Sequence, residues 1–283
     1  MQLSIIIVNY NTFELTSKCI RSIYDQVKDI AFEIILVDNA STEKNPDEFK
    51  VEFPNITLIK SETNLGFAKG NNLGIQHARG EYILLLNSDC ELRNNAPLIS
   101  YEYMKSHPRC GMSTVQLHYP DGRIQYNCRK FRTIGWELLE LAPLYLLLPK
   151  ARKEELMLHH YFKHDREMSC DWVWGTYMFF PRSILKSLPG EKLAEDFFMY
   201  SEDVLWCWQV KELGLDISFI PEGKVMHVHK GSSKGKKNSF HQMGINNHAI
   251  FMKRIYPNWK WYIFNLIYKS KQHTFSLLKK ILN

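Results

Sequence analysis

The first hundred residues alternate apolar strand patterns with helical patterns, and this alternation constrains the fold more than any other feature of the chain. The expected strands cover residues 4–8, 33–37, 56–60 and 82–86, and the expected helices cover 12–27 and 66–78. Continuous apolar strands separated by helices predict a parallel sheet covered on both faces. Right-handed crossovers then place the carboxyl end of every strand at one edge. The predicted fold class is α/β.

Polar residues follow three of these strands, at the edge where open α/β sheets bind their ligands. One such strand end is explained equally well by turn formers and helix caps, but three together favour a ligand site. Asp89 is suited to a hard cation, because Mg²⁺ often takes one or two carboxylates together with substrate phosphates; a helix N-cap is the alternative. The residues are Asn9, Tyr10 and Asn11 after the first strand, Asp38 after the second, and Asn87, Ser88 and Asp89 after the fourth.

The second half of the chain has a different pattern. A hairpin is predicted over residues 111–128, a strand over 172–180, short strands over 217–220 and 224–228, and helical structure over 240–283. An apolar run at 134–148 is too short to span a bilayer. The residues between 129 and 168 are otherwise irregular.

An acidic pair opens a later predicted helix. Ser201 precedes Glu202 and Asp203 as the expected N-cap, and the helical pattern runs to Leu213, where Gly214 is the expected C-terminal cap. Acidic residues stabilise any helix N-terminus, so one interpretation is structural. The other is a general base, and because neighbours on a helix point about 100° apart, only one of the two acids would face a given hydroxyl.

Two other patterns have both a ligand interpretation and a structural one. His227 and His229 alternate along a predicted strand and face the same side, as metal ligands or as ordinary strand residues. Residues 64–72 open a helix with two glycines, which suits a phosphate at a helix N-terminus or simply a tight turn. No GxGxxG follows the first strand, so a dinucleotide-binding domain is not supported.

The charge distribution singles out the C-terminal tail. The net charge is +6, yet residues 223–283 hold twelve Lys or Arg and no acidic residue. Aromatic side chains gather there with the lysines. Such a helix lies on an anionic bilayer, or it packs its apolar face on the rest of the protein. The residues are Trp259, Lys260, Trp261, Tyr262, Phe264, Tyr268, Lys269 and Lys271, followed by Lys279 and Lys280.

Taken in order, seven blocks of the sequence resemble the inverting family 2 glycosyltransferases with a GT-A fold, in particular their rhamnosyltransferase-like branch. The resemblance runs from residue 3 to about 235. It implies a mostly parallel central sheet flanked by helices. The implied domain is 1–235, with a nucleotide-binding half (1–110) and an acceptor and catalytic half (111–235), before a helical tail (236–283). The blocks are SIIIVNYN, ILVDNAS, NLGFAKGNN, LLLNSDCEL, WVWGTYMFFPRSIL, FFMYSEDV and HVHKGSS.

The resemblance also implies residue roles. Asp203 matches the catalytic base, with Glu202 beside it; Trp172 and Gly175 match the segment near the transferred sugar and the acceptor. Asp89 matches the second aspartate of the DXD element and implies a bound Mg²⁺ or Mn²⁺, with His227 or His229 as a further ligand. The implied donor-binding residues are Asn9, Tyr10, Asn11, Asp38, Asn64, Gly66, Phe67, Asn72, Asn87, Ser88 and Asp89.

The chain departs from the family pattern at three positions. Asn87 replaces the first aspartate of the DXD element, as is common in this branch. After the Glu-Asp pair, the family commonly has an aspartate and an arginine where this chain has Leu205 and Gln209.

The implied reaction is a single displacement with inversion. Its donor is a UDP- or dTDP-linked sugar, and its acceptor is a hydroxyl of a glycan or a lipid-linked glycan in polysaccharide, cell wall or O-antigen synthesis. Six scattered cysteines without a CxxC indicate free thiols, and the start of the chain has no export pattern. We therefore expect a cytoplasmic protein, peripheral on the inner face of the cytoplasmic membrane.

Other functions would produce different patterns. A nucleotidyltransferase would place a glycine-rich loop with Arg or Lys after the first strand, where this chain has residues 9–12 (NYNT). A nucleic-acid-binding module would use the basic tail, although the leading interpretation expects no nucleic acid. A catalytically inactive, sugar-binding relative is the third alternative, on account of Leu205 and Gln209.

Overall fold

The structure, a computed structural model, describes residues 1–228, 237–256 and 258–282. The strands are β1 (Leu3–Asn9), β2 (Phe32–Asp38), β3 (Thr57–Lys60), β4 (Tyr82–Leu86), β5 (Cys90–Leu92), β6 (Cys110–His118), β7 (Ile124–Gln125), β8 (Cys128–Arg129), β9 (Met168–Cys170), β10 (Trp172–Val173), β11 (Tyr177–Pro181) and β12 (Asp216–His227). The α-helices are α1 (Phe13–Gln26), α2 (Glu48–Glu52), α3 (Gly66–Ile75), α4 (Ala96–Ser106), α5 (Ile134–Leu141), α6 (Lys150–Met157), α7 (Glu202–Glu212), α8 (Lys237–Ile255) and α9 (Trp259–Leu282).

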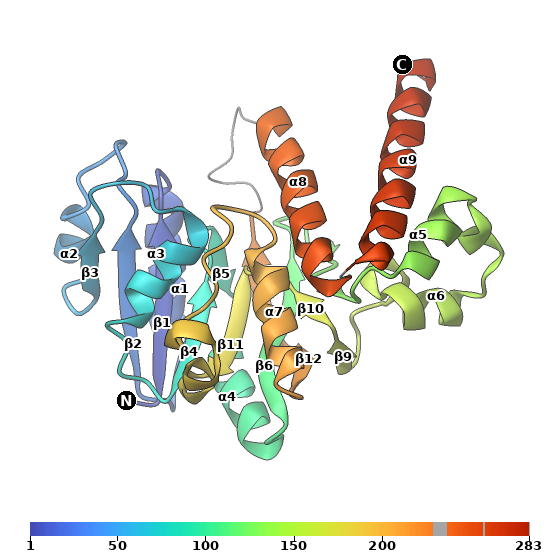
Figure 1. The fold of residues 1–283 in the computed structure, drawn as a ribbon. Helices are drawn as coiled ribbons and strands as arrows, with labels where there is room; N and C mark the ends of the chain where they lie inside the picture. Colours follow the sequence, from blue (N-terminus) through green and yellow to red (C-terminus); the bar gives the residue numbers. More distant parts are fainter. Residues whose placement is uncertain (229–236, 257, 283) are drawn as a thin grey trace.

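One large sheet organises the molecule (Figure 1). Its strand order is β3-β2-β1-β4-β11-β6-β12-β5, with β7 added to β6 and β9 to β12. Strands β1 to β4 are mutually parallel, β11 is antiparallel to both of its neighbours, and β12 is parallel to β6. The predicted α/β class with a mostly parallel sheet is confirmed, and so are the four N-terminal strands.

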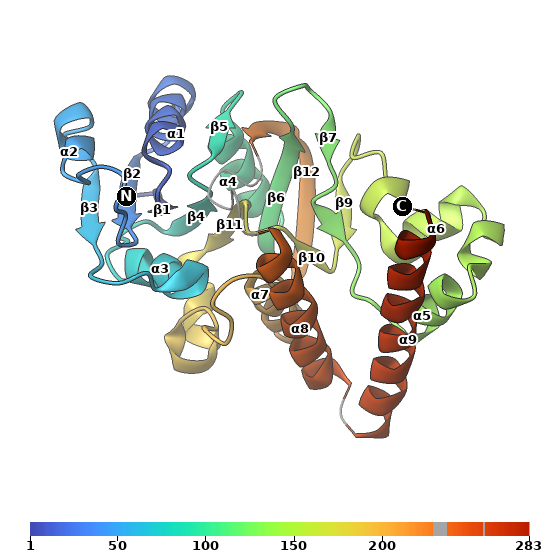
Figure 2. The same cartoon turned by 90° about the horizontal axis from the view of Figure 1, so that it is seen from above.

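Helices cover both faces of the sheet (Figure 2). Alternate residues of β1 point to opposite sides, so that Ile5 and Ile7 join the core under α1 and α4, whereas Ile6 joins the core under α3 and α7. All three side chains are fully buried. Burial on both faces explains why these strands are continuously apolar.

Two sequence predictions were wrong in detail. The segment 172–180 is two strands rather than one, because the chain breaks at Trp174–Thr176, pairing β10 with β8 in a small sheet and β11 with β4. The two predicted short strands after residue 216 form a single strand, β12, with a register shift between Ile220 and Lys224.

The predicted C-terminal helical extension is present as α8 and α9, which meet at one end and diverge in both views (Figures 1 and 2). Phe251, Phe264 and Tyr268 of these helices pack against Leu205 of α7 in a third apolar cluster. Lys271 is buried and ion-paired with Glu137 and Glu140, which ties α9 to α5. Among the described residues, no helix combines the length and the apolar character needed to cross a bilayer.

Candidate active site

A cavity of about 950 Å³ lies where the carboxyl end of β4, the start of α7 and the C-terminal helices meet. It brings together residues that are far apart in the sequence, including Asp89, Asp203 and His227. The polar residues that follow three strands were expected to share one crevice, and only those after β4 line this cavity; Asn9, Tyr10, Asn11 and Asp38 are not among its lining residues. Of the sequence-predicted site residues, those that line it are Phe67, Asn87, Ser88, Asp89, Trp172, Gly175, Glu202, Asp203 and His227.

The ends of β1 and β2 are joined by a buried hydrogen-bond network. Asn9 donates from Nδ2 to Asp38 at 2.8 Å and to Ser41 at 2.9 Å, and the Ser41 backbone N–H donates to the other oxygen of Asp38 at 3.1 Å. Asn11, at a positive φ of 53°, accepts the Thr42 N–H at 2.8 Å. Asn9 and Asp38 are therefore fixed side by side, with the partly exposed Tyr10 following Asn9.

The loop before α3 requires its glycine. Gly66 has a φ of +77°, and a Cβ there would lie 2.4 Å from the Phe198 carbonyl oxygen. Asn64 accepts the Gly66 N–H at 2.9 Å, and Phe67 donates its own N–H to the Phe198 oxygen at 2.9 Å. The loop thus fixes Phe67, whose ring stacks on Trp206 and lines the cavity.

Asn72 is placed differently from the expectation. Its amide donates to the Leu193 carbonyl at 2.8 Å and to Glu195 at 2.9 Å, and its oxygen accepts the Leu193 N–H at 3.2 Å. These bonds occupy the side chain on the 193–195 segment. Asn72 positions this segment and is not among the residues that line the described cavity.

The segment after β4 carries an unsatisfied acceptor. Ser88 shares a hydrogen bond of 3.0 Å with Thr12, which anchors the turn to the start of α1. The Oδ1 atom of Asn87 is buried and has no hydrogen-bond partner among the described residues. A buried unpaired amide oxygen costs free energy, and in a ligand cavity it marks a position for a hydroxyl, a water molecule or a cation.

Asp89 and His227 form the part of the site suited to a metal. The His227 Nε2 atom lies 3.3 Å from Asp89 Oδ1, and both residues are buried. Gln125 fixes the imidazole, since its oxygen lies 2.7 Å from His227 Nδ1 and its amide donates to the His227 carbonyl at 2.7 Å. A proton on Nδ1 leaves the Nε2 lone pair facing Asp89, as in metal-binding histidines.

Cys90 is near the same pair, but its thiol is a poor ligand. The potential ligand atoms of Asp89, Cys90 and His227 lie within 4.8 Å of one another. Burial raises the pKa of Cys90 well above its ordinary value, with Asp89 adding to the effect, and Mg²⁺ and Mn²⁺ prefer oxygen ligands to a thiolate. Mg²⁺ or Mn²⁺ would be held by the oxygen and nitrogen of Asp89 and His227. His229 lies outside the described residues.

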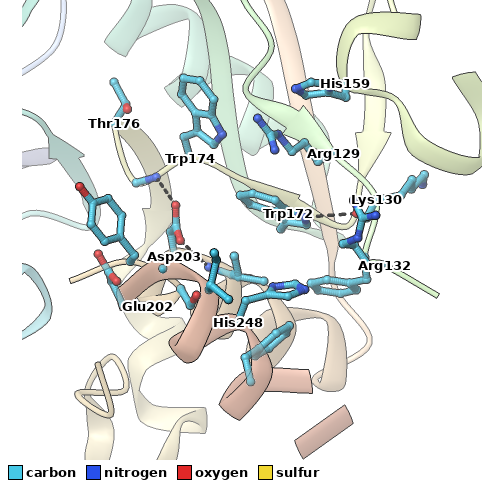
Figure 3. Close-up of a pocket in the computed structure, with 18 of the residues that line it drawn as sticks. Arg129, Lys130, Arg132, His159, Trp172, Trp174, Thr176, Glu202, Asp203 and His248 are labelled. Carbon is cyan, nitrogen blue, oxygen red and sulfur yellow. Dashed lines mark hydrogen bonds between the residues drawn. The ribbon is translucent and has the colours of Figure 1, made fainter. Parts of the chain in front are cut away.

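The two acids at the start of α7 have different surroundings (Figure 3). The carboxylate of Asp203 accepts the Gly175 N–H at 3.1 Å and its neighbouring Val204 N–H at 2.9 Å. Glu202 is buried, and its Oε2 atom has no hydrogen-bond partner among the described residues. The expected side-chain cap is absent, because Ser201, at a φ of 73°, makes no such bond.

Burial raises the pKa of both acids, but the neighbouring charges and hydrogen bonds differ between them. For Glu202, the negative charge of Asp203 adds to the effect of burial and holds the pKa well above its ordinary value. For Asp203, burial raises the pKa, while the two backbone N–H groups and the charge of Arg129 oppose the rise. The two backbone N–H bonds to Asp203 and the unbonded Oε2 atom of Glu202 therefore favour the charge on Asp203 and the proton on Glu202.

Sequence reasoning predicted Trp172 but missed the cavity residues around it, Arg129, Trp174 and His159. Arg129 packs against the rings of Trp172 and Trp174, at 5.2 and 5.4 Å from their centroids, and His159 lies beside it (Figure 3). Arg129 belongs to β8, Trp172 to β10, and His159 to a 3₁₀ turn in the irregular region; Trp174 follows β10. The sequence signal for this part of the site was the pair of tryptophans, Trp172 and Trp174, that precede Gly175.

Comparisons with known proteins agree with this arrangement. The family model described as Glycosyl transferase family 2 matches residues 4–188. A poly(ribitol-phosphate) beta-glucosyltransferase of Bacillus spizizenii is 34% identical over 110 residues, which are 37% of this chain and only 17% of that protein. An N-acetylglucosaminyl-diphospho-decaprenol L-rhamnosyltransferase of Mycobacterium tuberculosis is 24% identical over 223 residues, covering 74% of this chain and 70% of that one.

Solved structures share the fold. A mannosyltransferase of Pyrobaculum calidifontis, in complex with GDP-Man and Mn²⁺, superposes with a TM-score of 0.59 at 16% identity, over 95% of this chain and 68% of the other. The TarS fragment of S. aureus gives 0.56 at 16% identity, over 98% and 73%. These similarities confirm the GT-A fold, and together with the family model they show that the chain belongs to glycosyl transferase family 2.

Proposed function

We propose that the protein transfers a sugar from a UDP- or dTDP-linked donor to a hydroxyl of a glycan or lipid-linked acceptor, by a single displacement with inversion. The observation that carries the proposal is that Asp89 and Asp203 line one cavity. One molecule can therefore contact both, with its diphosphate toward Asp89 and its sugar toward Asp203. The relatives named above are a glucosyltransferase and a rhamnosyltransferase, and TarS structures hold UDP and UDP-GlcNAc.

Asp203 is the general base of this proposal. The acceptor hydroxyl oxygen bonds to the anomeric carbon as its proton passes to the Asp203 carboxylate, and the bond from that carbon to the diphosphate breaks. A base is most effective when its pKa lies near the working pH, which is the direction in which burial moves the pKa of Asp203. The N–H groups of Gly175 and Val204 hold the carboxylate in place.

Asp89 and His227 are the proposed metal ligands. A bound Mg²⁺ or Mn²⁺ would neutralise charge on the departing nucleoside diphosphate. Asn87, Ser88 and Phe67 complete the donor side of the cavity. We also propose that Asn9, Tyr10, Asn11, Asp38 and Asn64 shape the nucleotide pocket beside it, where Asp38 is held by Asn9 and Ser41.

Family membership favours transfer of a sugar over the nucleotidyltransferase and nucleic-acid-binding alternatives. The departure at Leu205 has a structural reason, because this side chain is fully buried against Phe251 and Phe264 of the C-terminal helices. A charged residue there would be buried in an apolar cluster. Nothing in the structure explains Gln209.

A thermal-shift screen of nucleotide sugars with Mn²⁺ or Mg²⁺ tests the donor class. A ligand at 100 times its Kd stabilises the folded state by about 2.7 kcal/mol, which corresponds to a rise in Tm on the order of 5 °C. We expect a UDP- or dTDP-sugar to give the largest rise, and only with the metal present. If no nucleotide sugar shifts the Tm, or if the nicotinamide dinucleotides shift it equally, the proposed donor is wrong.

The C-terminal helices are the proposed membrane contact. One face of α9 is buried, but Trp259, Tyr262 and Leu266 are 64%, 73% and 69% exposed. Leu147, in the segment next to α5, is 82% exposed, and exposed lysines at 253, 260 and 269 accompany this face. Apolar side chains flanked by lysines suit an anionic bilayer surface, where a lipid-linked acceptor would be found.

Vesicle flotation tests this contact. We expect the double variant Trp259→Ser/Leu266→Ser to partition onto phosphatidylglycerol vesicles at least about tenfold more weakly than the unmodified protein, since each fully buried apolar side chain contributes about 1.5–3 kcal/mol. Val51→Ser is the matched control, because Val51 is 85% exposed on α2, at the opposite end of the sheet (Figure 1). Equal flotation of the double variant and the control would contradict the membrane contact.

A further inference from the structure

Part of the cavity lining is basic and aromatic. Four basic side chains line it: Arg129, Lys130, Arg132 and Lys271. Three of them already have carboxylate partners in the structure. Lys130 pairs with Asp171 at 3.4 Å, whereas Arg132 and Lys271 both pair with Glu137 and Glu140.

Arg129 is different from the other three. No carboxylate oxygen of the described residues lies within the 4.0 Å of an ion pair with it, and the one hydrogen bond of its side chain to them runs from Nε to the Tyr126 carbonyl at 3.3 Å. The four N–H bonds of its terminal nitrogens are left for a ligand. Burial lowers the pKa of Arg129 to about 10, but the guanidinium still carries its charge at neutral pH.

The surroundings of Arg129 hold the group in place. Its guanidinium packs on Trp172 and Trp174, whose rings favour a cation and restrict its rotation. A backbone bridge joins Arg129 to Leu158. Leu158 and His159 both have positive φ, at 55° and 47°, and this backbone turn places His159 beside the guanidinium (Figure 3).

Two imidazoles extend the donor set. The Nδ1 atoms of His159 and His160 lie 2.7 Å apart, and both residues line the cavity. Burial lowers the pKa of His159 to about 3, and the charge of Arg129 contributes, so the ring is neutral. Burial also lowers the pKa of His160. One N–H is shared between the two Nδ1 atoms, so two neutral rings leave one N–H for a ligand. A fixed guanidinium with a neighbouring neutral N–H donor suits a tetrahedral oxyanion, above all a phosphate.

Aromatic rings continue the wall beyond this basic group. Trp136 lies 6.1 Å from Tyr145 and 6.5 Å from Tyr161, measured between ring centroids, and all three residues line the cavity. A molecule that places a phosphate on Arg129 thus has room for an apolar or sugar-bearing part along these rings. Its other end lies toward Asp203, whose charge acts on Arg129.

From this arrangement we infer that Arg129 is a binding residue for a phosphate group carried by the acceptor, with Trp172, Trp174 and His159 as its supports. The inference rests on the proposed function and narrows it, because it makes the acceptor a phosphate ester rather than a neutral glycan. The phosphate belongs either to a lipid headgroup or to a polyol phosphate, and the two sources share this chemistry.

Calorimetric titration of the full chain in EDTA with octyl phosphate, glycerol 1-phosphate and octanol tests the inference. We expect a phosphate to bind and octanol not to bind. Arg129→Gln is expected to weaken phosphate binding at least about tenfold, as a lost charge-assisted hydrogen bond implies. The phosphate affinity of Arg129→Lys is expected to lie between those of the unmodified protein and Arg129→Gln. If octyl phosphate binds more tightly than glycerol 1-phosphate, the subsite takes a lipid phosphate. If the two bind equally, the subsite recognises the phosphate group and not the part attached to it.

Two controls separate this subsite from the rest of the site. Arg123→Gln removes an exposed arginine that pairs with Asp121 and is expected to bind octyl phosphate like the unmodified protein. UDP with Mn²⁺ is expected to bind Arg129→Gln unchanged, which also shows that the variant is folded. Equal phosphate binding by Arg129→Gln and Arg123→Gln overturns the inference, and so does a parallel loss of UDP binding in Arg129→Gln. Failure of UDP to bind the unmodified protein would instead count against the proposed donor site.

Discussion

Replacing Asp203 by Asn is expected to lower the rate of sugar transfer by about 10²–10⁴-fold, the usual contribution of a positioned general base. The amide has nearly the same shape as the carboxylate but does not accept a proton at neutral pH. Donor binding should change by less than about threefold, because Asp203 takes no part in holding the diphosphate. Steady-state kinetics with titration of UDP and Mn²⁺ separates the two effects.

The pH profile gives the same test a second readout. The base must be ionised, so kcat/KM should rise with pH through the pKa of Asp203, at a pH above the ordinary aspartate range because burial raises that pKa. This rising limb should be lost in Asp203→Asn. Glu202→Gln is the contrasting variant, since the amide resembles the protonated acid that the environment of Glu202 favours; a loss of less than about tenfold is expected. If Glu202→Gln were the inactive variant and Asp203→Asn retained its turnover, the roles would be reversed.

Replacing Asp89 by Ala is expected to remove metal-dependent donor binding. Only Asp89 and His227 are proposed to hold the cation, so losing the carboxylate should weaken UDP affinity in the presence of Mn²⁺ by more than about 100-fold. Without metal, UDP should bind Asp89→Ala and the unmodified protein equally weakly. Isothermal calorimetry of UDP with and without Mn²⁺ measures both affinities.

Two further variants, Gln125→Leu and Asp47→Ala, are expected to lose less UDP affinity than Asp89→Ala. Gln125→Leu keeps both proposed ligands but removes the hydrogen bond to His227 Nδ1, and losses of about 10–100-fold are typical for such supporting residues. Asp47→Ala removes an exposed carboxylate that pairs with Lys60 on the surface and should leave the affinity unchanged. If Asp89→Ala bound UDP and Mn²⁺ like Asp47→Ala, the metal assignment would be wrong.

The sequence predicted the sheet because burial on both faces leaves a simple pattern. β4 is apolar at every position, and all five residues are buried. Asp89 and Asp203 were found for a related reason, since each follows a clear structural signal, a buried strand end or a helix start. The strands of the second half were harder, because the break at Trp174–Thr176 is marked only by Gly175 and Thr176, and a single glycine in an apolar run also occurs at a bulge within one strand.

Arg129 and His159 could not be predicted as members of the site. They belong to a region without periodicity, and they reach the cavity through the pairing of β8 with β10 and a backbone bridge to Leu158. The buried pair of Lys271 and Glu137 joins residues 134 positions apart. Contacts over such separations depend on the tertiary structure and leave no local signal. The division of the chain at residue 235 stays a prediction, although α8 and α9 contribute to the cavity wall.

A crystal structure of Asp203→Asn with an intact nucleotide sugar and Mn²⁺ would test the central claim most directly, since the variant is expected to turn the donor over too slowly to lose it. We predict an anomalous Mn²⁺ peak between Asp89 and His227, the diphosphate on that ion, and the anomeric carbon facing position 203 within the same cavity. A donor whose sugar points away from position 203, or a metal bound elsewhere on the protein, would contradict the account.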